Sequence, residues 1–420
     1  YQACGTPFIG WMRNCMFNPF DIILYLLPSI YSWDVYYLFR LFFSGITMFL
    51  FMKKIKCSTL SSLTASVSYM FSGPVIVHIF DIHMNPSMLF PLFFWGVENL
   101  CQNKNKASSV ILSITIILLI LSGFPEHVVL ISMIGLAYFI FRTIIMEGCW
   151  KLLPSLKYIL IPFIVAFFAT VLILLPLIEF FFIHGWTSHY KNVGLYCLEP
   201  SEILSIFIPY YSGGISRLYI GIMPIFLSIM AFGTKETSRI ACFAGIVLIL
   251  LWAKIFGLPV INMIGYLPIM NIFLFPNNSC QVVSFIISIL VGIGFENLYY
   301  KKVSSSFMYS SLILFIILSV ISFIYILSFN PMAQMHLYIK YIICLLMLFV
   351  YIIKPKRIGI ICFVLLSLEL FSFIPRERLH KLDSFPSVPY LEFIKKEQLV
   401  DRGRAFGLYG QFNPNVATAY

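Results

Sequence analysis

The stretch that decides the fold is "YILIPFIVAFFATVLILLPLIEFF", Tyr158 to Phe181, which contains a single charged side chain, Glu179. A helix needs about 20 mostly apolar residues to cross a bilayer, so this run is long enough to span a membrane. The whole chain has the same character, because 60% of its 420 residues are hydrophobic and only 11% are charged. Its mean hydropathy is +0.94. So few charges could not cover the apolar surface of a soluble protein, and the sequence predicts an integral membrane protein.

Similar apolar runs recur along the chain and predict an all-α, polytopic transmembrane helix bundle with about twelve spans. The runs lie near residues 35–52, 59–80, 84–100, 107–121, 127–146, 157–182, 219–234, 240–257, 279–298, 306–328, 337–353 and 358–374. The apolar stretch 22–33 is too short to span, and we expect it to lie in the membrane interface.

Lysine and arginine predict the orientation of the bundle. Alternate loops hold 15 of the 28 basic residues, whereas the opposite loops before residue 376 hold three, namely Arg13, Lys191 and Arg217. The 15 are Lys53, Lys54, Lys56, Lys104, Lys106, Arg142, Lys151, Lys157, Lys235, Arg239, Lys301, Lys302, Lys354, Lys356 and Arg357. The positive-inside rule places the lysine-rich loops in the cytoplasm. Because the basic residues lie in these short loops, the net charge of +11 does not indicate nucleic-acid binding.

The two ends of the chain are expected on the outer side. Residues 1–375 form the predicted bundle, and a chain that starts outside requires an earlier span, so we expect the first span and the start of the first outer loop to be missing. Residues 376–420 hold 12 charges in 45 residues and predict the beginning of an extracytoplasmic soluble domain. The ten cysteines include no CxxC pair, which gives no support to a zinc or redox motif. Cys4 and Cys15 could pair outside, although free thiols are the simpler expectation.

Four outer segments carry the groups that could do chemistry. They are residues 1–34 with Asp21 and Asp34, "HIFDIHMNP" from His78 to Pro86, "SGFPEH" from Ser122 to His127, and the loop 184–218. Carboxylates and imidazoles at the ends of several helices predict a shared, hydrated cleft.

Each of these residues also has a structural alternative. Asp81 could N-cap the next helix with Asn85 and Pro86, and His83 could be an interfacial side chain with a hydrated tip. Glu126 and His127 could be the polar start of a helix.

The two outer arginines have alternatives as well. Arg40 lies inside an apolar run and needs an anionic partner, which could be Asp34, Asp81 or a ligand phosphate. Arg217 is either solvated or meets an anionic ligand.

Other motifs carry little functional information. "GVENL" (Gly96–Leu100) nearly repeats as "GFENL" (Gly294–Leu298), and each glutamate is expected to be hydrated at the inner interface near a following lysine. Phosphate-binding glycine loops, HExxH pairs and GxSxG turns do not occur in the sequence. Outer Asp and His side chains could hold a divalent cation, but no spacing specifies a metal site, and no other cofactor is indicated.

Eight stretches, in the same order along the chain, resemble the YfhO family of bacterial membrane proteins, and the resemblance extends over nearly the whole chain. They are "SLTASVSYMFSG" (Ser62–Gly73), "HMNPSMLFPLFFWGVENL" (His83–Leu100), "LSGFPEH" (Leu121–His127), "PLIEFF" (Pro176–Phe181), "LEPSEILSIFIPYYSGG" (Leu198–Gly214), "YIGIMPIFLSIMAF" (Tyr219–Phe232), "LPIMNIFLFPNNSCQVVSFIISILVGIGFENL" (Leu267–Leu298) and "RAFGLYGQFNPNVATAY" (404–420).

That family is similar to GT-C glycosyltransferases, so the resemblance implies a GT-C-like bundle in the bacterial cytoplasmic membrane. It implies transfer of a sugar from a polyprenyl-phosphate carrier to a cell-surface polymer or lipid, such as teichoic acid, at the outer face. Asp81 would then be the catalytic base, helped by His83 and the pair Glu126 and His127. Asp21, Arg40 and Arg217 would bind substrate, with the two arginines near the phosphate.

The chain departs from the family pattern in two places. The aspartate that the first outer loop usually supplies is expected before Tyr1, and "LFPNN" (Leu274–Asn278) lacks the arginines common there in relatives. A transporter or flippase of lipid-linked sugars, or a catalytically inactive scaffold for cell-envelope glycan assembly, therefore stays open. A transporter predicts ionisable groups at mid-membrane and two matching halves, whereas here the polar groups gather at one face.

Overall fold

The computed structural model describes residues 15–184, 193–209, 216–234, 238–267, 270–300 and 358–372, with parts of 303–317. The helices in these ranges are α1 (Ile22–Leu26), α2 (Ser29–Lys54), α3 (Thr59–Met70), α4 (Gly73–Val77), α5 (Met84–Ser87), α6 (Phe90–Asn103), α7 (Lys106–Leu121), α8 (Pro125–Glu147), α9 (Leu152–His184), α10 (Ile222–Met230), α11 (Arg239–Ile255), α12 (Pro259–Asn262), α13 (Phe275–Tyr299) and α16 (Ile358–Ser372). Short 3-10 turns are η2 (Pro19–Asp21), η3 (Cys149–Lys151), η4 (Val193–Leu195), η5 (Pro200–Ile206), η6 (Met263–Tyr266) and η7 (Met270–Ile272). Because the described residues contain helices and no strands, the predicted all-α class is confirmed for them.

Four helices in the described residues are long and apolar enough to cross a membrane: Tyr31–Lys54, Pro125–Glu147, Cys149–Glu179 and Phe275–Tyr299. A fifth span is added if Arg239–Ile255 and Pro259–Tyr266, which meet at 82°, count as one bent element. The predicted number of about twelve stays a prediction. The run 337–353, most of 306–328 and the proposed outer domain 376–420 lie outside the described residues.

Two predicted spans are broken in the structure, and proline stands at each break. The run 59–80 gives α3, which ends at Met70, and then α4, whose first turn contains Pro74. The run 84–100 gives α5 and then α6, whose first turn contains Pro91. Proline lacks the N–H that a helix interior needs, but it fits the first turn of a new helix. The breaks leave the segment from His78 to His83 as an irregular turn outside the long helices.

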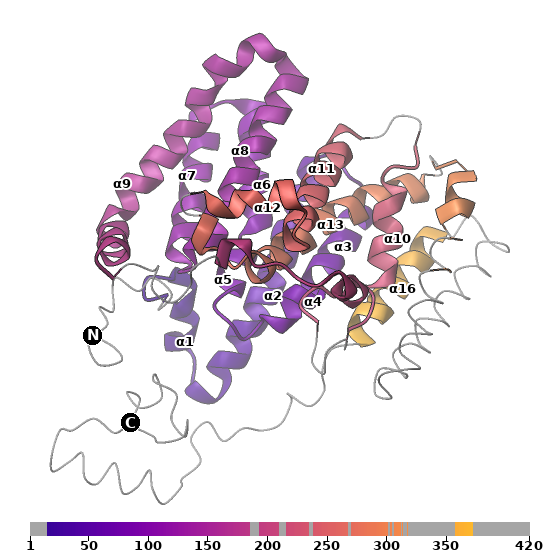
Figure 1. Ribbon diagram of the computed structural model, residues 1–420, viewed down its shortest axis with the longest axis horizontal. Coiled ribbons are helices and arrows are strands. Elements are labelled where there is room, and N and C mark those ends of the chain that lie inside the picture. The colour runs from indigo at the N-terminus through magenta and orange to yellow at the C-terminus, as the bar shows by residue number, and fades with distance from the viewer. Residues whose placement is uncertain are drawn as a thin grey trace, which may run out of the picture.

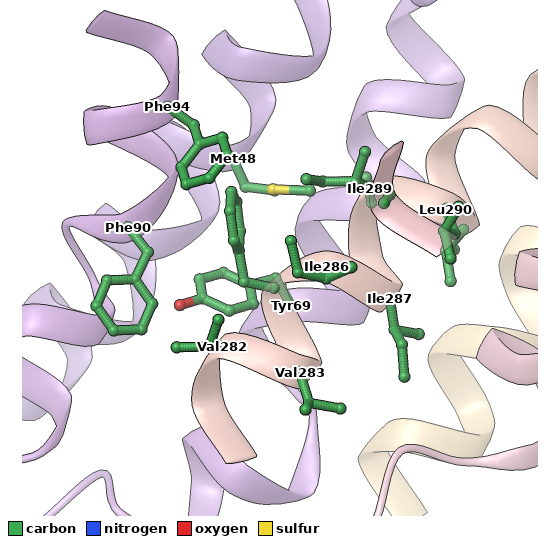
Figure 2. Close-up of a cluster of buried hydrophobic side chains, with 14 of the residues drawn as sticks. Met48, Tyr69, Phe90, Phe94, Val282, Val283, Ile286, Ile287, Ile289 and Leu290 are labelled. Atoms are coloured by element: carbon green, nitrogen blue, oxygen red, sulfur yellow. The ribbon is translucent and has the colours of Figure 1, made fainter. Parts of the chain in front are cut away.

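Helix α13 lies at the centre of the bundle and α9 at its edge (Figure 1). In α13, 89% of the most apolar window is buried, whereas in α9 only 22% is buried. Helices α10, α3 and α11 pack around α13, and α7 packs on α9. Figure 2 shows Ile286 of α13 beside Met48 of α2, Tyr69 of α3 and Phe94 of α6 in the buried core. The apolar side chains that α9 exposes are those expected to face lipid.

Among the described residues, the lysine-rich ends of the helices hold two ion pairs, one of them with a buried carboxylate. Glu98, which was expected to be hydrated, is fully buried, and its carboxylate accepts hydrogen bonds from Tyr138 at 2.8 Å and from Arg142 Nε at 2.8 Å. The following lysine, Lys104, pairs instead with Glu147 of α8. The expectation for Glu98 was wrong because α8 packs against α6 and brings Arg142 to it, a contact that local sequence does not reveal.

The second glutamate of the near-repeat, Glu296, lies partly exposed at the lysine-rich end of α13. Its carboxylate accepts hydrogen bonds from Ser58 N at 3.0 Å and from Ser61 Oγ at 2.5 Å. A cavity of about 830 Å³ adjoins it, lined also by Lys56 and Asn297. The cavity therefore lies at the opposite end of α13 from the polar segments described next.

Candidate functional site

The turn between α4 and α5 places one carboxylate between two imidazoles. Asp81 Oδ2 lies 3.3 Å from His78 Nδ1 and 2.9 Å from His83 Nδ1. The turn is local in origin, since Asp81 N donates to the His78 carbonyl at 2.9 Å and Asp81 Oδ1 accepts from Ile82 N at 2.7 Å. The carboxylate therefore makes no N-cap bond to a helix, and it faces the histidines instead.

The electrostatics of the turn keep Asp81 ionised. Burial alone would raise the pKa of its carboxyl, but the hydrogen bond with His78 and the His83 imidazole 2.9 Å away hold that pKa well below its usual range. Burial lowers the pKa of the His78 imidazole, and the charges of His83 and Arg217 act in the same direction. The Asp81 side chain is 45% exposed while that of His78 is only 7% exposed, so the cluster opens to solvent through the carboxylate.

Arg40 of α2 fixes the backbone of this turn. Its guanidinium donates to the carbonyl oxygens of Ile79 at 2.6 Å and Asp81 at 3.0 Å, and to Asn85 Oδ1 at 2.9 Å. The Tyr36 ring lies 4.5 Å from the guanidinium carbon. Arg40 is only 3% exposed, so its charge is stabilised by oriented carbonyl dipoles.

Asn85 connects the turn to the first polar segment. The Tyr36 hydroxyl lies 3.2 Å from Asn85 Oδ1 and donates to Asp21 Oδ1 at 2.5 Å. Asn18 donates to the same Asp21 oxygen at 2.7 Å. Burial raises the pKa of the Asp21 carboxyl above its usual value, although the hydrogen bonds from Tyr36 and Asn18 oppose that shift. Asp21 is therefore joined to the Asp81 turn through Tyr36 and Asn85.

The third polar segment packs on His83. The ring centroids of His83 and Phe124 lie 4.2 Å apart, and those of His83 and His127 lie 5.5 Å apart. His127 is fully buried, and its Nε2 lies 3.3 Å from Gln281 Oε1 of α13. Glu126 is 3% exposed in the first turn of α8. Both residues are thus the polar start of a helix, and His127 also lies beside the cluster.

The fourth segment carries Arg217 and is joined to the start of α4 by a backbone hydrogen bond. The side chain of Arg217 is exposed, and its charge acts on His78 across the fold. The neighbouring Tyr219 carbonyl accepts a hydrogen bond from Gly73 N at 2.8 Å, which ties this loop to the start of α4. The remainder of the predicted loop, residues 185–192 and 210–215, lies outside the described residues. The predicted gathering of polar segments at one end of the bundle is therefore seen for the residues described.

One cysteine contacts the third polar segment. Cys15 is buried, and its Sγ donates to the Ser122 carbonyl at 3.4 Å. Burial raises the pKa of this thiol to about 11, so the group is inert. Cys4, the other cysteine of the considered pair, lies outside the described residues.

Two buried ionisable residues were not predicted. Lys254 of α11 donates from Nζ to the Gly194 carbonyl at 2.6 Å and to Asn262 Oδ1 at 2.5 Å. Glu369 of α16 accepts from the backbone N–H groups of Ile222 at 2.7 Å and Met223 at 2.8 Å, and so caps the start of α10. Both stand inside apolar runs, where an ionisable residue is itself a signal, but only the fold shows that each one binds backbone groups.

Comparison with known proteins shows a match to one family and a similarity to one solved structure. The sequence profile described as "Bacterial membrane protein YfhO" matches residues 14–383. A search of curated proteins gave no match. Among solved structures, the crystal structure of ArnT from Cupriavidus metallidurans bound to undecaprenyl phosphate is similar, with a TM-score of 0.49 and 13% sequence identity. The similarity covers 84% of this chain and spans about 65% of the length of that one.

Proposed function

The chain belongs to the YfhO family of bacterial membrane proteins, and on this premise we propose that it transfers a sugar from a polyprenyl-phosphate carrier to a cell-surface polymer or lipid at the outer face of the membrane. The family's similarity to GT-C glycosyltransferases supplies the reaction class. The observation that carries the proposal is the position of Asp81, an ionised carboxylate between two imidazoles at the end of the bundle opposite the lysine-rich loops.

The proposed chemistry is a displacement at the anomeric carbon of the carrier-bound sugar. The acceptor hydroxyl oxygen forms a bond to that carbon, the bond from the carbon to the phosphate oxygen breaks, and polyprenyl phosphate leaves with the electron pair. The hydroxyl proton passes to Asp81 Oδ2 and can move on to His83, whose Nδ1 is 2.9 Å away. A low pKa makes Asp81 a weak base, so this second acceptor matters.

The other predicted residues fit supporting roles. Arg217 is exposed and its charge reaches the cluster, so we propose that it meets the departing phosphate. Arg40 is buried on protein carbonyls, and we assign it to positioning the turn. His127 packs beside His83, and Glu126 precedes it in the first turn of α8. Asp21 accepts the hydrogen bond of Tyr36, whose hydroxyl also lies beside Asn85.

A transfer assay tests the proposal. Full-length protein in vesicles is given a radiolabelled polyprenyl-phosphate sugar and an acceptor, and the labelled product is measured. Asp81→Asn removes the proton acceptor with little change of shape, and we expect the rate to fall by about 100-fold or more. The matched control is Asp34→Asn, which alters an exposed aspartate on α2 and should leave the rate within about twofold of wild type. Full activity in Asp81→Asn would refute the assignment.

The same vesicles distinguish the transporter alternative. A flippase moves the labelled lipid between leaflets without an acceptor, and it forms no new glycosidic bond. Lipid movement that is independent of the acceptor and unaffected by Asp81→Asn would favour transport over transfer.

A further inference from the structure

The turn between α4 and α5 also has the composition of a metal site. His78, Asp81 and His83 each offer one ligand atom, and these three atoms lie within 4.8 Å of one another. Asp81 Oδ2 is 3.3 Å from one histidine Nδ1 and 2.9 Å from the other. The donors of a tetrahedral zinc ion, with bonds of about 2.0–2.1 Å, are roughly 3.3 Å apart. The carboxylate oxygen thus already lies at nearly the required distance from both imidazoles.

We propose that His78, Asp81 and His83 bind one Zn²⁺ ion. Two imidazole nitrogens and one carboxylate oxygen are a donor set that zinc accepts readily, whereas Mg²⁺ and Ca²⁺ prefer oxygen ligands alone. The inference stands on this geometry and does not depend on the glycosyl transfer proposed above.

An unpaired nitrogen atom in the turn supports a missing ligand. Among the described residues, the buried His83 Nδ1 has no hydrogen-bond partner. His83 Nδ1 lies 2.9 Å from Asp81 Oδ2, but it is not aligned to form a hydrogen bond with that oxygen. Buried polar atoms without partners are rare in native proteins, and an ion is one of the few explanations for them. A zinc ion would provide His83 Nδ1 with a bond that the protein does not supply.

The arrangement leaves one coordination position open. The histidine side chains are 7% and 18% exposed, but Asp81 is 45% exposed, so a fourth ligand can approach from solvent. Three protein ligands with an open fourth position are typical of zinc sites that bind or activate a small ligand. Arg40 lies 3.0 Å from the Asp81 carbonyl, and the charge of Arg217 reaches His78. The positive charges of these two arginines lower the affinity of the site for Zn²⁺ and favour an anion as the fourth zinc ligand.

Zinc and the proton-acceptor role would use the same atom. A zinc ion on Asp81 Oδ2 occupies one lone pair of that oxygen and lowers its basicity, so the metal-bound carboxylate would be a poorer proton acceptor than the metal-free one. Zinc binding can therefore be tested without any assay of transfer.

Zinc titration tests the site directly. Full-length protein in detergent, freed of its affinity tag and stripped with a chelator, is titrated with Zn²⁺ against a chromophoric competitor. We expect Asp81→Asn and His83→Gln each to bind about one equivalent less than wild type. The matched control is His127→Gln, which removes a histidine beside the cluster that is outside the donor set, and it should retain the equivalent.

Two results would overturn the zinc site. One is a wild-type protein that binds no more zinc than folded Asp81→Asn protein, with folding checked by size-exclusion chromatography and thermal unfolding. If the variants do not fold, X-ray absorption on zinc-loaded wild-type protein decides the question. Two imidazoles in the zinc shell support the site, and sulfur ligands or an absence of imidazole would contradict it.

Discussion

At the residue scale, Asn85 joins polar groups from three separate segments. Asn85 Oδ1 accepts from Arg40 at 2.9 Å and lies 3.2 Å from the Tyr36 hydroxyl, and the Asn85 amide nitrogen lies 3.5 Å from the Ser122 carbonyl. The sequence predicted a polar role for Asn85 as a helix cap and marked Arg40 as a residue in need of partners. The identity of those partners could not be predicted, because they lie about 40 residues apart and meet only when α2, α5 and α7 pack.

Asp21 gives a prediction at this scale that depends on pH. A carboxyl whose pKa is higher in the folded chain than in the unfolded chain keeps its proton longer when folded. It therefore contributes stability at low pH that is lost as pH rises from the unfolded value, near 3.9, through the folded one. Asp21→Asn removes this loss but keeps an oxygen for Tyr36 and Asn18. We expect the variant to be at least as stable as wild type at pH 7.

The measurement is the thermal unfolding midpoint of detergent-solubilised protein between pH 4 and pH 7. Relative to Asp21→Asn, wild type should lose stability across this range as pH rises. Asp34→Asn is the matched control and should follow the wild-type profile. A variant that is less stable at pH 7, with an unchanged dependence on pH, would contradict the account of Asp21.

At the element scale, the two copies of the near-repeat, "GVENL" in α6 and "GFENL" in α13, place their glutamates in different environments. The first glutamate is a fully buried ion-pair partner, whereas the second is partly exposed and binds Ser58 and Ser61. Helical character and the approximate extents of α2, α7, α8, α9, α11 and α13 could be predicted from apolar length alone. The breaks between α3 and α4 and between α5 and α6 could not be predicted in this way. Apolar length does not indicate that a new helix begins at Pro74 or at Pro91.

The glycines of this near-repeat should respond differently to substitution. A Cβ on Gly294 would meet the Leu227 carbonyl oxygen at 1.8 Å, since the backbones of α13 and α10 touch there. A Cβ on Gly96 would meet the end of the Leu112 side chain at 3.2 Å, and the Leu112 backbone lies at an ordinary contact distance of 3.7 Å. Gly294→Ala should therefore destabilise the protein by about 1–3 kcal/mol or more, whereas Gly96→Ala should be neutral or stabilising. Thermal unfolding of the two variants in parallel tests this, and equal midpoints would disprove the close approach.

The ion pair of Glu98 and Arg142 predicts how strongly α6 and α8 stabilise each other. Glu98→Gln leaves the Arg142 charge without its anion between α6 and α8, which we expect to cost about 3–5 kcal/mol. Arg142→Gln should cost a similar amount because it leaves the buried carboxylate unpaired. The double variant should recover much of the loss, since two amides can bond each other and Tyr138. Additive losses in the cycle would show that the ion pair does not couple the helices.

At the scale of the whole molecule, the structure separates two kinds of polar group. A Glu–Arg pair with a buried carboxylate and a half-buried Lys–Glu pair lie at the lysine-rich end, and the Asp81 cluster with its associated network lies at the other. This separation could be predicted from the sequence because alternate loops differ so strongly in basic residues. The sequence also marked Asp81, His83, Glu126 and His127, but not the contact of His83 with His127, which depends on how α5 meets α8.

The central claim is that the Asp81 end of the bundle faces outward, and two native cysteines test it most directly. Cys197 is exposed in the loop that precedes η5, and Cys149 is exposed in η3 at the lysine-rich end. Intact cells are treated with a membrane-impermeant maleimide, and the modified peptides are identified by mass spectrometry. We predict that Cys197 reacts in intact cells, whereas Cys149 reacts only after the membrane is permeabilised. Reaction of Cys149 but not Cys197 in intact cells would place the Asp81 cluster in the cytoplasm and contradict the proposed transfer at the outer face.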